Sequence, residues 1–191
     1  MGSPFLYFAD DRLSTAELSA ACLDGHLVEL GEAYIPADAV ETAALRGGSL
    51  ARLLGDVLAA THLSAAWVHG ALPAPPSRHT VQRAVPRRLH HLIGRRFQYR
   101  DLCVAAHDLD RIGGVLVTTP ARTLADLSRV DDRVHRNAAR LMGAEGIVDP
   151  GAAIDWLERS VPVPHKRQAL ALLRGWAVEG PRQDEVTRYT S

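Results

Sequence analysis

The sequence predicts a mixed α+β fold, in which a small N-terminal unit precedes a mixed α/β domain with a helical C-terminal part. Two observations support this prediction. Residues 13–36 have the signals of a capped helix, a helix stop and a two-stranded hairpin. Downstream, short strand-like runs alternate with helical periods before several helical segments follow one another. With 191 residues and 47% hydrophobic content, the chain is long enough to bury a core.

The N-terminal helix is expected from Thr15 to Leu23. Residues 14–17, Ser-Thr-Ala-Glu, fit a capping box, in which the Ser14 hydroxyl accepts from the Glu17 amide while the Glu17 carboxylate accepts from the Ser14 amide. Leu13 and Leu18 occupy the positions of a hydrophobic staple. The helix should stop at Asp24-Gly25, because glycine readily adopts the left-handed conformation after a C-cap.

A β-hairpin is expected next, with Gly31-Glu32 as a type II′ turn and Pro36 at the end of its second strand. A helix, a stop and a hairpin in this order are typical of the second half of a winged helix, a fold that commonly binds DNA. We therefore expect a reduced winged helix-turn-helix over residues 1–45, an α/β domain over residues 46–180 and a flexible tail over residues 181–191.

The second part of the chain should begin with helices. Residues 48–60 follow a helical period and predict one helix. A further helix should begin at Ser64 as its cap and end at Gly70. The Pro-rich residues 71–77 then predict a loop.

Short strands and then helices should complete the domain. Residues 79–85 predict a strand, residues 95–107 one or two more, residues 108–114 a turn, and residues 115–119 a buried strand. Thr119-Pro120 predicts a helix start, with threonine as cap and proline at the first position. Three more helices are expected at about 131–143, 150–160 and 165–178.

Charge is strongly segregated along the chain, although the formal net charge is zero. Residues 1–56 contain three basic and nine acidic residues, a balance of −6. Residues 57–100 contain seven arginines and no acid, a balance of +7. Residues 101–191 contain twelve basic and thirteen acidic residues, a balance of −1. The span without carboxylates is the most polarised feature of the sequence.

The sequence favours a protein of the cytoplasm. No apolar run approaches the roughly 20 residues that cross a bilayer, and the N-terminus lacks the basic and apolar regions of a signal peptide. Cys22 and Cys103 are far apart and have no cysteine or histidine at metal-binding spacing. We expect a soluble chain in a reducing compartment.

No catalytic motif is present, since the sequence lacks GxSxG, HExxH, Walker A and GxGxxG patterns. His62 and His69 would need a third partner to hold a metal. Asp108 and Asp110 could form an acidic pair, but they are more simply explained as turn residues. We expect no enzymatic activity, no cofactor and no metal.

The acid-free span is the strongest indication of function. Clustered cations without nearby carboxylates suit phosphate neutralisation, and arginine adds a bidentate fork for phosphate or guanine. A solvated face in an arginine-rich protein is the alternative, because 21 of the 22 basic residues are arginine. The candidate nucleic-acid-binding residues are Arg78, Arg83, Arg87, Arg88, Arg95, Arg96 and Arg100, together with Ser14, Thr15 and Ser19 of the first helix.

Three stretches resemble the AbiEi antitoxins of type IV toxin–antitoxin systems, most closely the short actinobacterial branch. They are the N-terminal helix and hairpin, LSAAWVHGALPAPPSRH at 63–79 and VTTPARTLADLSR at 117–129, and VPHKRQALALLR at 163–174 is also similar. The resemblance implies a winged helix followed by a C-terminal α/β domain, binding to repeats in the protein's own promoter, and a nucleotidyltransferase-like toxin as partner. It also implies a shared structural motif that contains Trp67, Thr119, Arg122, Thr123 and Asp126, with Asp126 holding Arg122 one helical turn back.

The first helix departs from that family pattern. Its polar positions are Thr15, Glu17, Ser19 and Asp24, which cannot supply long-range attraction to DNA. A winged helix that reads DNA normally has a helix before this one, whereas only twelve residues precede Leu13 here. The sequence thus predicts a DNA-binding regulator that represses its own operon through residues 78–100. The alternative is a protein-interaction module with a degenerate winged helix, which binds a toxin or another protein and no DNA.

Overall fold

The computed structural model describes residues 3–89 and 96–179. Its centre is a mixed five-stranded sheet in the order β5-β4-β3-β7-β6. The β3–β7 and β4–β5 pairs are parallel, while β3–β4 and β6–β7 are antiparallel. The strands are β3 (Leu58–Ala60), β4 (His79–Arg83), β5 (Phe97–Cys103), β6 (Leu109–Ile112) and β7 (Val115–Thr118).

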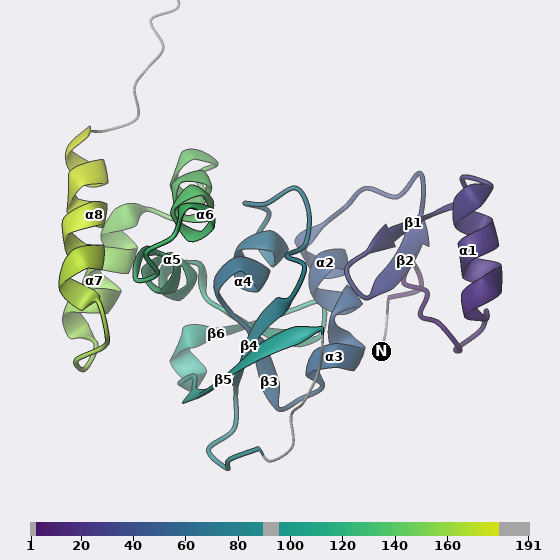
Figure 1. The fold of residues 1–191 in the computed structure, drawn as a ribbon, viewed down its shortest axis with the longest axis horizontal. Coiled ribbons are helices and arrows are strands. Elements are labelled where there is room, and N and C mark those ends of the chain that lie inside the picture. Colours follow the sequence, from purple (N-terminus) through teal and green to yellow (C-terminus); the bar gives the residue numbers. More distant parts are fainter. Residues whose placement is uncertain (1–2, 90–95, 180–191) are drawn as a thin grey trace, which may run out of the picture.

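The helices gather on either side of this sheet along the long axis of the molecule (Figure 1). The C-terminal helices lie at one end, and the N-terminal unit lies at the other. The prediction of a mixed α+β fold is confirmed. The helices of the larger part are α2 (Ala43–Ser49), α3 (Ala51–Leu54), α4 (His62–Val68), the 3-10 turn η1 (Ala106–Asp108), α5 (Pro120–Ser128), α6 (Arg133–Ala144), α7 (Pro150–Arg159) and α8 (Lys166–Glu179).

The N-terminal unit consists of α1 (Thr15–Leu23) and the hairpin β1 (Leu27–Leu30)–β2 (Ala33–Pro36), as the local signals predict. Both halves of the capping box are present: the Ser14 amide donates to Glu17 Oε2 at 2.7 Å, and the Glu17 amide donates to Ser14 Oγ at 3.3 Å. Gly25, at φ 75°, ends the helix, and the amide of His26 donates to the carbonyl of Ala21. This is the hydrogen bonding of a Schellman stop.

The hairpin turn packs closely against the larger part of the chain, and only glycine at position 31 leaves room for this contact. A Cβ on this residue would lie 2.5 Å from Ser49 Oγ and 2.9 Å from the Trp67 ring. Its φ of 57°, at the first central position, is the one that a type II′ turn requires. Leu30 and Ile35 of the hairpin consequently share one buried cluster with Trp67 and the inner sheet residues.

Three local predictions are wrong. Residues 48–60 are not one helix, because Gly55 adopts a φ of 53° after α3 and residues 58–60 form the central strand β3. Ser64 does not cap α4; the helix begins at His62, and the Ser64 hydroxyl accepts from the Thr80 amide instead. Residues 108–114 are not a simple turn, since β6 occupies 109–112 and only Gly113-Gly114 reverse the chain.

A second buried cluster joins α4 to the C-terminal helices. Leu124 and Leu127 of α5 are fully buried in it, as the sequence predicts for that helix, together with Met142, Leu157 and Leu173 of α6, α7 and α8. Helix α5 lies between the sheet and the other helices of this group (Figure 1). Among the residues that the structure describes, no helix is long and apolar enough to cross a membrane.

Gly31→Ala should destabilise the fold more than Gly25→Ala. Both replacements place a side chain on left-handed backbone, which costs about 1–2 kcal/mol, but only the first adds a collision with Ser49 and Trp67. We expect the free energy of unfolding, measured by urea titration, to fall by at least about 2 kcal/mol for Gly31→Ala. Equal losses in the two variants would contradict the close docking of the hairpin.

Candidate nucleic-acid interface

The predicted basic span lies on β4 and β5, and β5 is an edge strand of the sheet. The two strands run parallel, with His79 opposite Phe97. Arg78 and Arg96 therefore lie side by side at the starts of the strands, whereas Arg83 ends β4 and is followed by Arg87 and Arg88. The span is thus divided into two groups of cations, one at each end of the strand pair.

At the strand starts, both arginines are exposed. The Arg78 guanidinium donates to the Phe97 carbonyl at 3.0 Å, which leaves most of its donors facing solvent. The Arg96 side chain is 75% exposed and forms an ion pair with Glu32 of the hairpin turn, at 2.5 Å between Nη1 and Oε2. A carboxylate from the N-terminal unit therefore opposes the field of this group.

At the strand ends, Arg83 has a structural role. Its Nε lies 3.1 Å from Asp101 Oδ1, and its Nη1 donates to the carbonyl oxygens of Val85 and Pro86. Arg88 is 77% exposed, with its Nε 3.8 Å from Asp101 Oδ2. Arg87 is exposed and makes no ion pair with any residue that the structure describes. This group therefore offers Arg87 and Arg88 to a ligand and uses Arg83 to hold the following loop.

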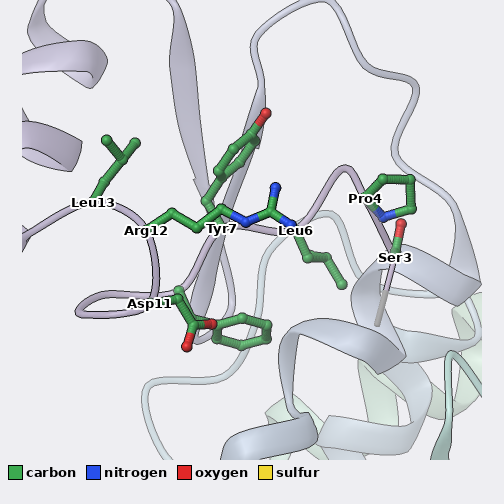
Figure 2. Close-up of a pocket in the computed structure, with 8 residues that line it drawn as sticks. Ser3, Pro4, Leu6, Tyr7, Asp11, Arg12 and Leu13 are labelled. Carbon is green, nitrogen blue, oxygen red and sulfur yellow. The ribbon is translucent and has the colours of Figure 1, made fainter. Parts of the chain in front are cut away.

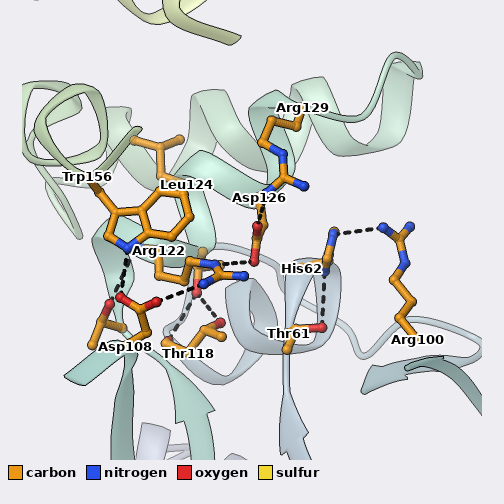
Figure 3. A network of polar contacts seen from close by, with 12 residues as sticks. Thr61, His62, Arg100, Asp108, Thr118, Arg122, Leu124, Asp126, Arg129 and Trp156 are labelled. Carbon is orange, nitrogen blue, oxygen red and sulfur yellow. Dashed lines mark hydrogen bonds and ion pairs between the residues drawn. The ribbon is translucent and has the colours of Figure 1, made fainter. Parts of the chain in front are cut away.

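Arg100 points away from the other arginines, toward the start of α4. Its Nη1 donates to His62 Nε2 at 3.1 Å, so the His62 Nδ1 carries the hydrogen and donates to Thr61 Oγ1 at 3.0 Å (Figure 3). Burial lowers the pKa of His62 to about 4, and Arg100 adds to this effect while Asp126 opposes it. Arg95 lies outside the described residues.

The exposed cations are therefore Arg78, Arg87, Arg88 and Arg96, which we call the arginine edge. Two carboxylates reach it from outside the acid-free span: Glu32, from the hairpin, and Asp101, which directly follows the span. Segregation of charge along the sequence thus overstates its segregation in space.

The predicted helical contacts meet the arginine edge in one groove of about 430 Å³. Thr15, Glu32 and Tyr34 line one side of the groove, and Ser77 and Arg96 belong to the other. The two serines are less available: the Ser14 hydroxyl is part of the capping box, and the Ser19 hydroxyl donates to the Thr15 carbonyl at 2.8 Å. Of the three candidates on α1, Thr15 alone lies in a groove with an exposed arginine.

A serine, a histidine and a glutamate lie in line beneath this groove. Ser64 Oγ is 3.1 Å from His79 Nδ1, and His79 Nε2 is 4.0 Å from Glu32 Oε1. The pKa of His79 lies below its ordinary value because the ring is buried, although the carboxylate of Glu32 opposes this shift. Ser64 is completely buried and its oxygen accepts from the Thr80 amide, so no substrate can reach this hydroxyl in the described conformation. The arrangement fixes the hairpin and offers no exposed nucleophile.

A buried ionic cluster joins the sheet to the C-terminal helices (Figure 3). The Arg122 guanidinium donates to Asp126 Oδ2 at 2.8 Å and to Asp108 Oδ2 at 2.7 Å. Trp156 Nε1 donates to the other oxygen of Asp108 at 2.7 Å, and its ring centroid lies 4.4 Å from the Arg122 guanidinium carbon. Arg129 donates to Asp126 Oδ1 at 2.8 Å.

This cluster confirms the predicted contact between Asp126 and Arg122 one turn apart. Burial tends to lower the pKa of Arg122, but the two carboxylates raise it above its ordinary value. Asp108 has a different role from the expected one, because it is a buried partner of Arg122 and Trp156 instead of a turn residue. Its partners are 14 and 48 residues away along the chain, so no local signal indicates them.

The other residues of the expected motif also support the fold. Thr119 caps α5 by accepting from the Arg122 amide, and the hydroxyls of Thr118 and Thr123 lie 2.7 Å apart at the sheet–helix junction. Trp67 is fully buried, and the Arg46 guanidinium lies 5.7 Å from its ring centroid. None of these groups faces the arginine edge.

A separate hollow of about 520 Å³ lies along the N-terminal segment and is lined by both apolar and polar side chains (Figure 2). Arg12 is its basic side chain and Asp11 its acidic one, and Asp11 forms an ion pair with Arg52. A lining with one cation and one engaged carboxylate provides neither a phosphate site nor an acid–base pair.

The part of the chain that contains the five-stranded sheet is similar to a known protein family. Residues 58–141 match a family model described as the AbiEi antitoxin C-terminal domain. The matched residues run from β3 into α6, so they include the arginine edge and most of the ionic cluster. The resemblance to AbiEi-like antitoxins is confirmed. None of the curated proteins compared with the chain matches it.

Asp126→Ala should be strongly destabilising, because it leaves Arg122 and Arg129 buried without their shared carboxylate. Breaking one side of a buried ion pair costs about 3–5 kcal/mol. The matched control is Glu158→Ala, which removes a half-exposed partner of Arg174 and should cost about 0–1 kcal/mol. Urea titration measures both, and similar small losses would contradict the role of the cluster.

Acidification should destabilise the protein partly through His62. Its pKa is lowered to about 4 in the folded chain, so the unfolded chain binds the proton first as the pH falls below about 6.5. Stability contributed by neutral His62 is therefore lost between about pH 6.5 and 4, by up to about 3 kcal/mol. His62→Asn, which suits the left-handed backbone there, should give a shallower fall in urea titrations. Identical pH dependence in both proteins would refute this assignment.

Proposed function

We propose that this chain, which resembles the AbiEi antitoxins over residues 58–141, is the antitoxin of a type IV toxin–antitoxin system and acts as a DNA-binding transcriptional regulator that represses its own operon from promoter repeats. The observation that carries the proposal is the arginine edge, which lies within the matched domain and exposes four guanidinium groups. Guanidinium groups bind phosphate by paired hydrogen bonds, and they retain their charge at every physiological pH.

The spacing of the two cation groups supports binding across a groove of duplex DNA. β4, which lies between the two groups along the chain, spans five residues and is roughly 13 Å long at about 3.3 Å per residue. The length of this strand is close to the roughly 12 Å width of the major groove. Arg78 and Arg96 contact one phosphate backbone in this proposal, and Arg87 and Arg88 contact the other.

In this proposal the hairpin orients the DNA-binding surface and contributes little to the electrostatic attraction of DNA. Its turn holds Glu32 against Arg96, and Thr15 lies in the same groove. No lysine or arginine occurs between Leu13 and Leu45, so α1 and the hairpin lack the cations by which a winged helix holds DNA. In our proposal the unit is a degenerate winged helix that orients the arginine edge.

The proposed setting is the cytoplasm, with a nucleotidyltransferase-like toxin as the partner of the regulated system and no catalytic activity in this chain. The inaccessible Ser64 hydroxyl supports a non-enzymatic role. A protein-interaction module without DNA binding is the competing function, favoured by the acidic N-terminal unit, and it makes a different prediction in a gel shift.

Replacing Arg78, Arg87, Arg88 and Arg96 together with alanine should weaken binding to the protein's upstream DNA by about a hundredfold or more, because four phosphate contacts are lost. The slope of log affinity against log salt concentration should fall by roughly 3 to 4. Gel shifts and anisotropy titrations measure both effects.

A matched variant controls for net charge. The exposed residues Arg133, Arg140, Arg159 and Arg167 lie on α6, α7 and α8, and their joint replacement with alanine changes the charge by the same amount. It should bind the upstream DNA nearly as well as the unaltered protein. Equal binding by both variants, or no binding by the unaltered protein, would favour the interaction module over the proposed regulator.

A further inference from the structure

Two arginines from different elements lie around the buried imidazole of His62 (Figure 3). Arg100 of β5 donates through Nη1 to His62 Nε2 at 3.1 Å, and Arg129, at the end of α5, donates through Nη1 to Asp126 Oδ1 at 2.8 Å. Arg100, Arg129 and Asp126 all influence the pKa of His62, so the four side chains are close neighbours. They lie where the parallel strands β3 and β7 end and α4 and α5 begin, and none of them belongs to the arginine edge.

Both guanidinium groups keep donors without a partner in the part of the chain that the structure describes. Arg100 uses one of its N–H groups, on His62, and forms no ion pair with a described residue. Arg129 donates through Nε to the Pro164 carbonyl and through Nη1 to Asp126, which leaves its Nη2 group. The Arg129 side chain is 13% exposed and Arg100 is half-buried. Guanidinium groups with such reachable donors bind oxyanions by paired hydrogen bonds.

The charges around this imidazole do not balance. Three guanidinium groups meet two carboxylates in the connected cluster, namely Arg100, Arg122 and Arg129 against Asp108 and Asp126. Burial lowers the pKa of Arg129, Asp126 opposes this shift, and the other two guanidinium groups add to it. An anion between Arg129 and Arg100 would balance the remaining positive charge and reduce the repulsion between them.

The other neighbours are an imidazole and an amide. His135 of α6 stands nearly perpendicular to His62, with 6.1 Å between the ring centroids, and its Nδ1 lies 2.7 Å from Asp132 Oδ2. Gln82 of β4 is opposite Arg100 in the parallel register, so both side chains project from the same face of the sheet. Gln82 Oε1 is buried and has no hydrogen-bond partner among the described residues. An unsatisfied amide beside a half-buried arginine is consistent with a polar ligand at this position.

We propose that Arg100 and Arg129 form a binding site for the terminal phosphate of a phosphate monoester, with His62 as the acceptor that orients Arg100. A terminal phosphate carries roughly 1.5–2 negative charges near pH 7 and three acceptor oxygens, which suit two guanidinium forks. Because His62 is 2% exposed, the position suits the end of a small ligand better than the backbone of a duplex. The proposal goes beyond DNA binding and rests on residues outside the arginine edge.

The test titrates the full-length, ¹⁵N-labelled protein with phenyl phosphate at constant ionic strength near neutral pH. We expect saturable chemical-shift changes centred on His62, Arg100 and Arg129. Dimethyl phosphate, a diester with the chemistry of the DNA backbone, should bind at least about tenfold more weakly, because it carries less charge and fewer terminal oxygens. Equal binding of the two compounds would assign the site to backbone phosphate. That result, or the lack of saturable changes at these residues, would overturn the proposal.

Substitutions of Arg100 locate the site. Arg100→Gln should weaken phenyl phosphate binding by at least about tenfold, since it removes one charge and one guanidinium fork and leaves the ion pairs of Arg122 in place. Arg100→Lys keeps the charge without the fork and should weaken binding by a smaller factor. The matched control is Arg159→Gln, which removes an exposed arginine of α7 and should leave binding unchanged. Circular dichroism checks that the variants are folded, and unaltered binding by both Arg100 variants would reject the site.

Two comparisons separate this site from the DNA-binding proposal. Joint replacement of the arginine edge with alanine should leave phenyl phosphate binding unchanged, whereas its loss would assign the phosphate to that edge and overturn the proposal. Arg100→Gln should retain binding to upstream DNA, and loss of that binding would assign Arg100 to a DNA phosphate instead of a separate ligand. If the unaltered protein binds no DNA, the phenyl phosphate titration still tests the site by itself.

Discussion

The arrangement of the larger domain depends on the ion pairs that the Arg122 guanidinium forms with Asp108 and Asp126. The guanidinium joins Asp108, just before β6, to Asp126 of α5, and it stacks on Trp156 of α7. Charges withdrawn from water are tolerated only when partners satisfy them, so each group constrains the others. The sheet, the helix that follows it and the third C-terminal helix are therefore fixed relative to one another, which gives the mixed sheet a rigid support.

Two surfaces of different charge lie outside this rigid part of the molecule. The arginine edge lies at the two ends of the β4–β5 strand pair, and α1, with its exposed Glu17 and Asp24, lies at the far end of the N-terminal unit. The Arg96–Glu32 ion pair connects the two regions across one groove. Charge that is separated along the sequence is thus partly compensated in space, and the exposed remainder determines which partner each surface can attract.

Local signals predicted local structure well. The capping box at Ser14 and Glu17, the Gly31 turn and the Thr119-Pro120 helix start each depend on residues close together in sequence, and the structure contains all three. The sequence does not reveal strand β3, because its three apolar residues have no distinctive period and directly follow a helical pattern. The candidate site was predicted only in part. Asp108, Asp101 and Glu32 pair with Arg122, Arg88 and Arg96, and these pairings come from topology, which sequence spacing does not encode.

The central claim is that the arginine edge, and not α1, is the surface that contacts DNA. Hydrogen exchange of the full-length protein, followed by mass spectrometry with and without a duplex of its upstream region, tests this claim most directly. We predict slower exchange at the ends of β4 and β5 and in the loop that contains Arg87 and Arg88, with unchanged exchange in α1. Protection concentrated in α1, with none along β4 and β5, would contradict it.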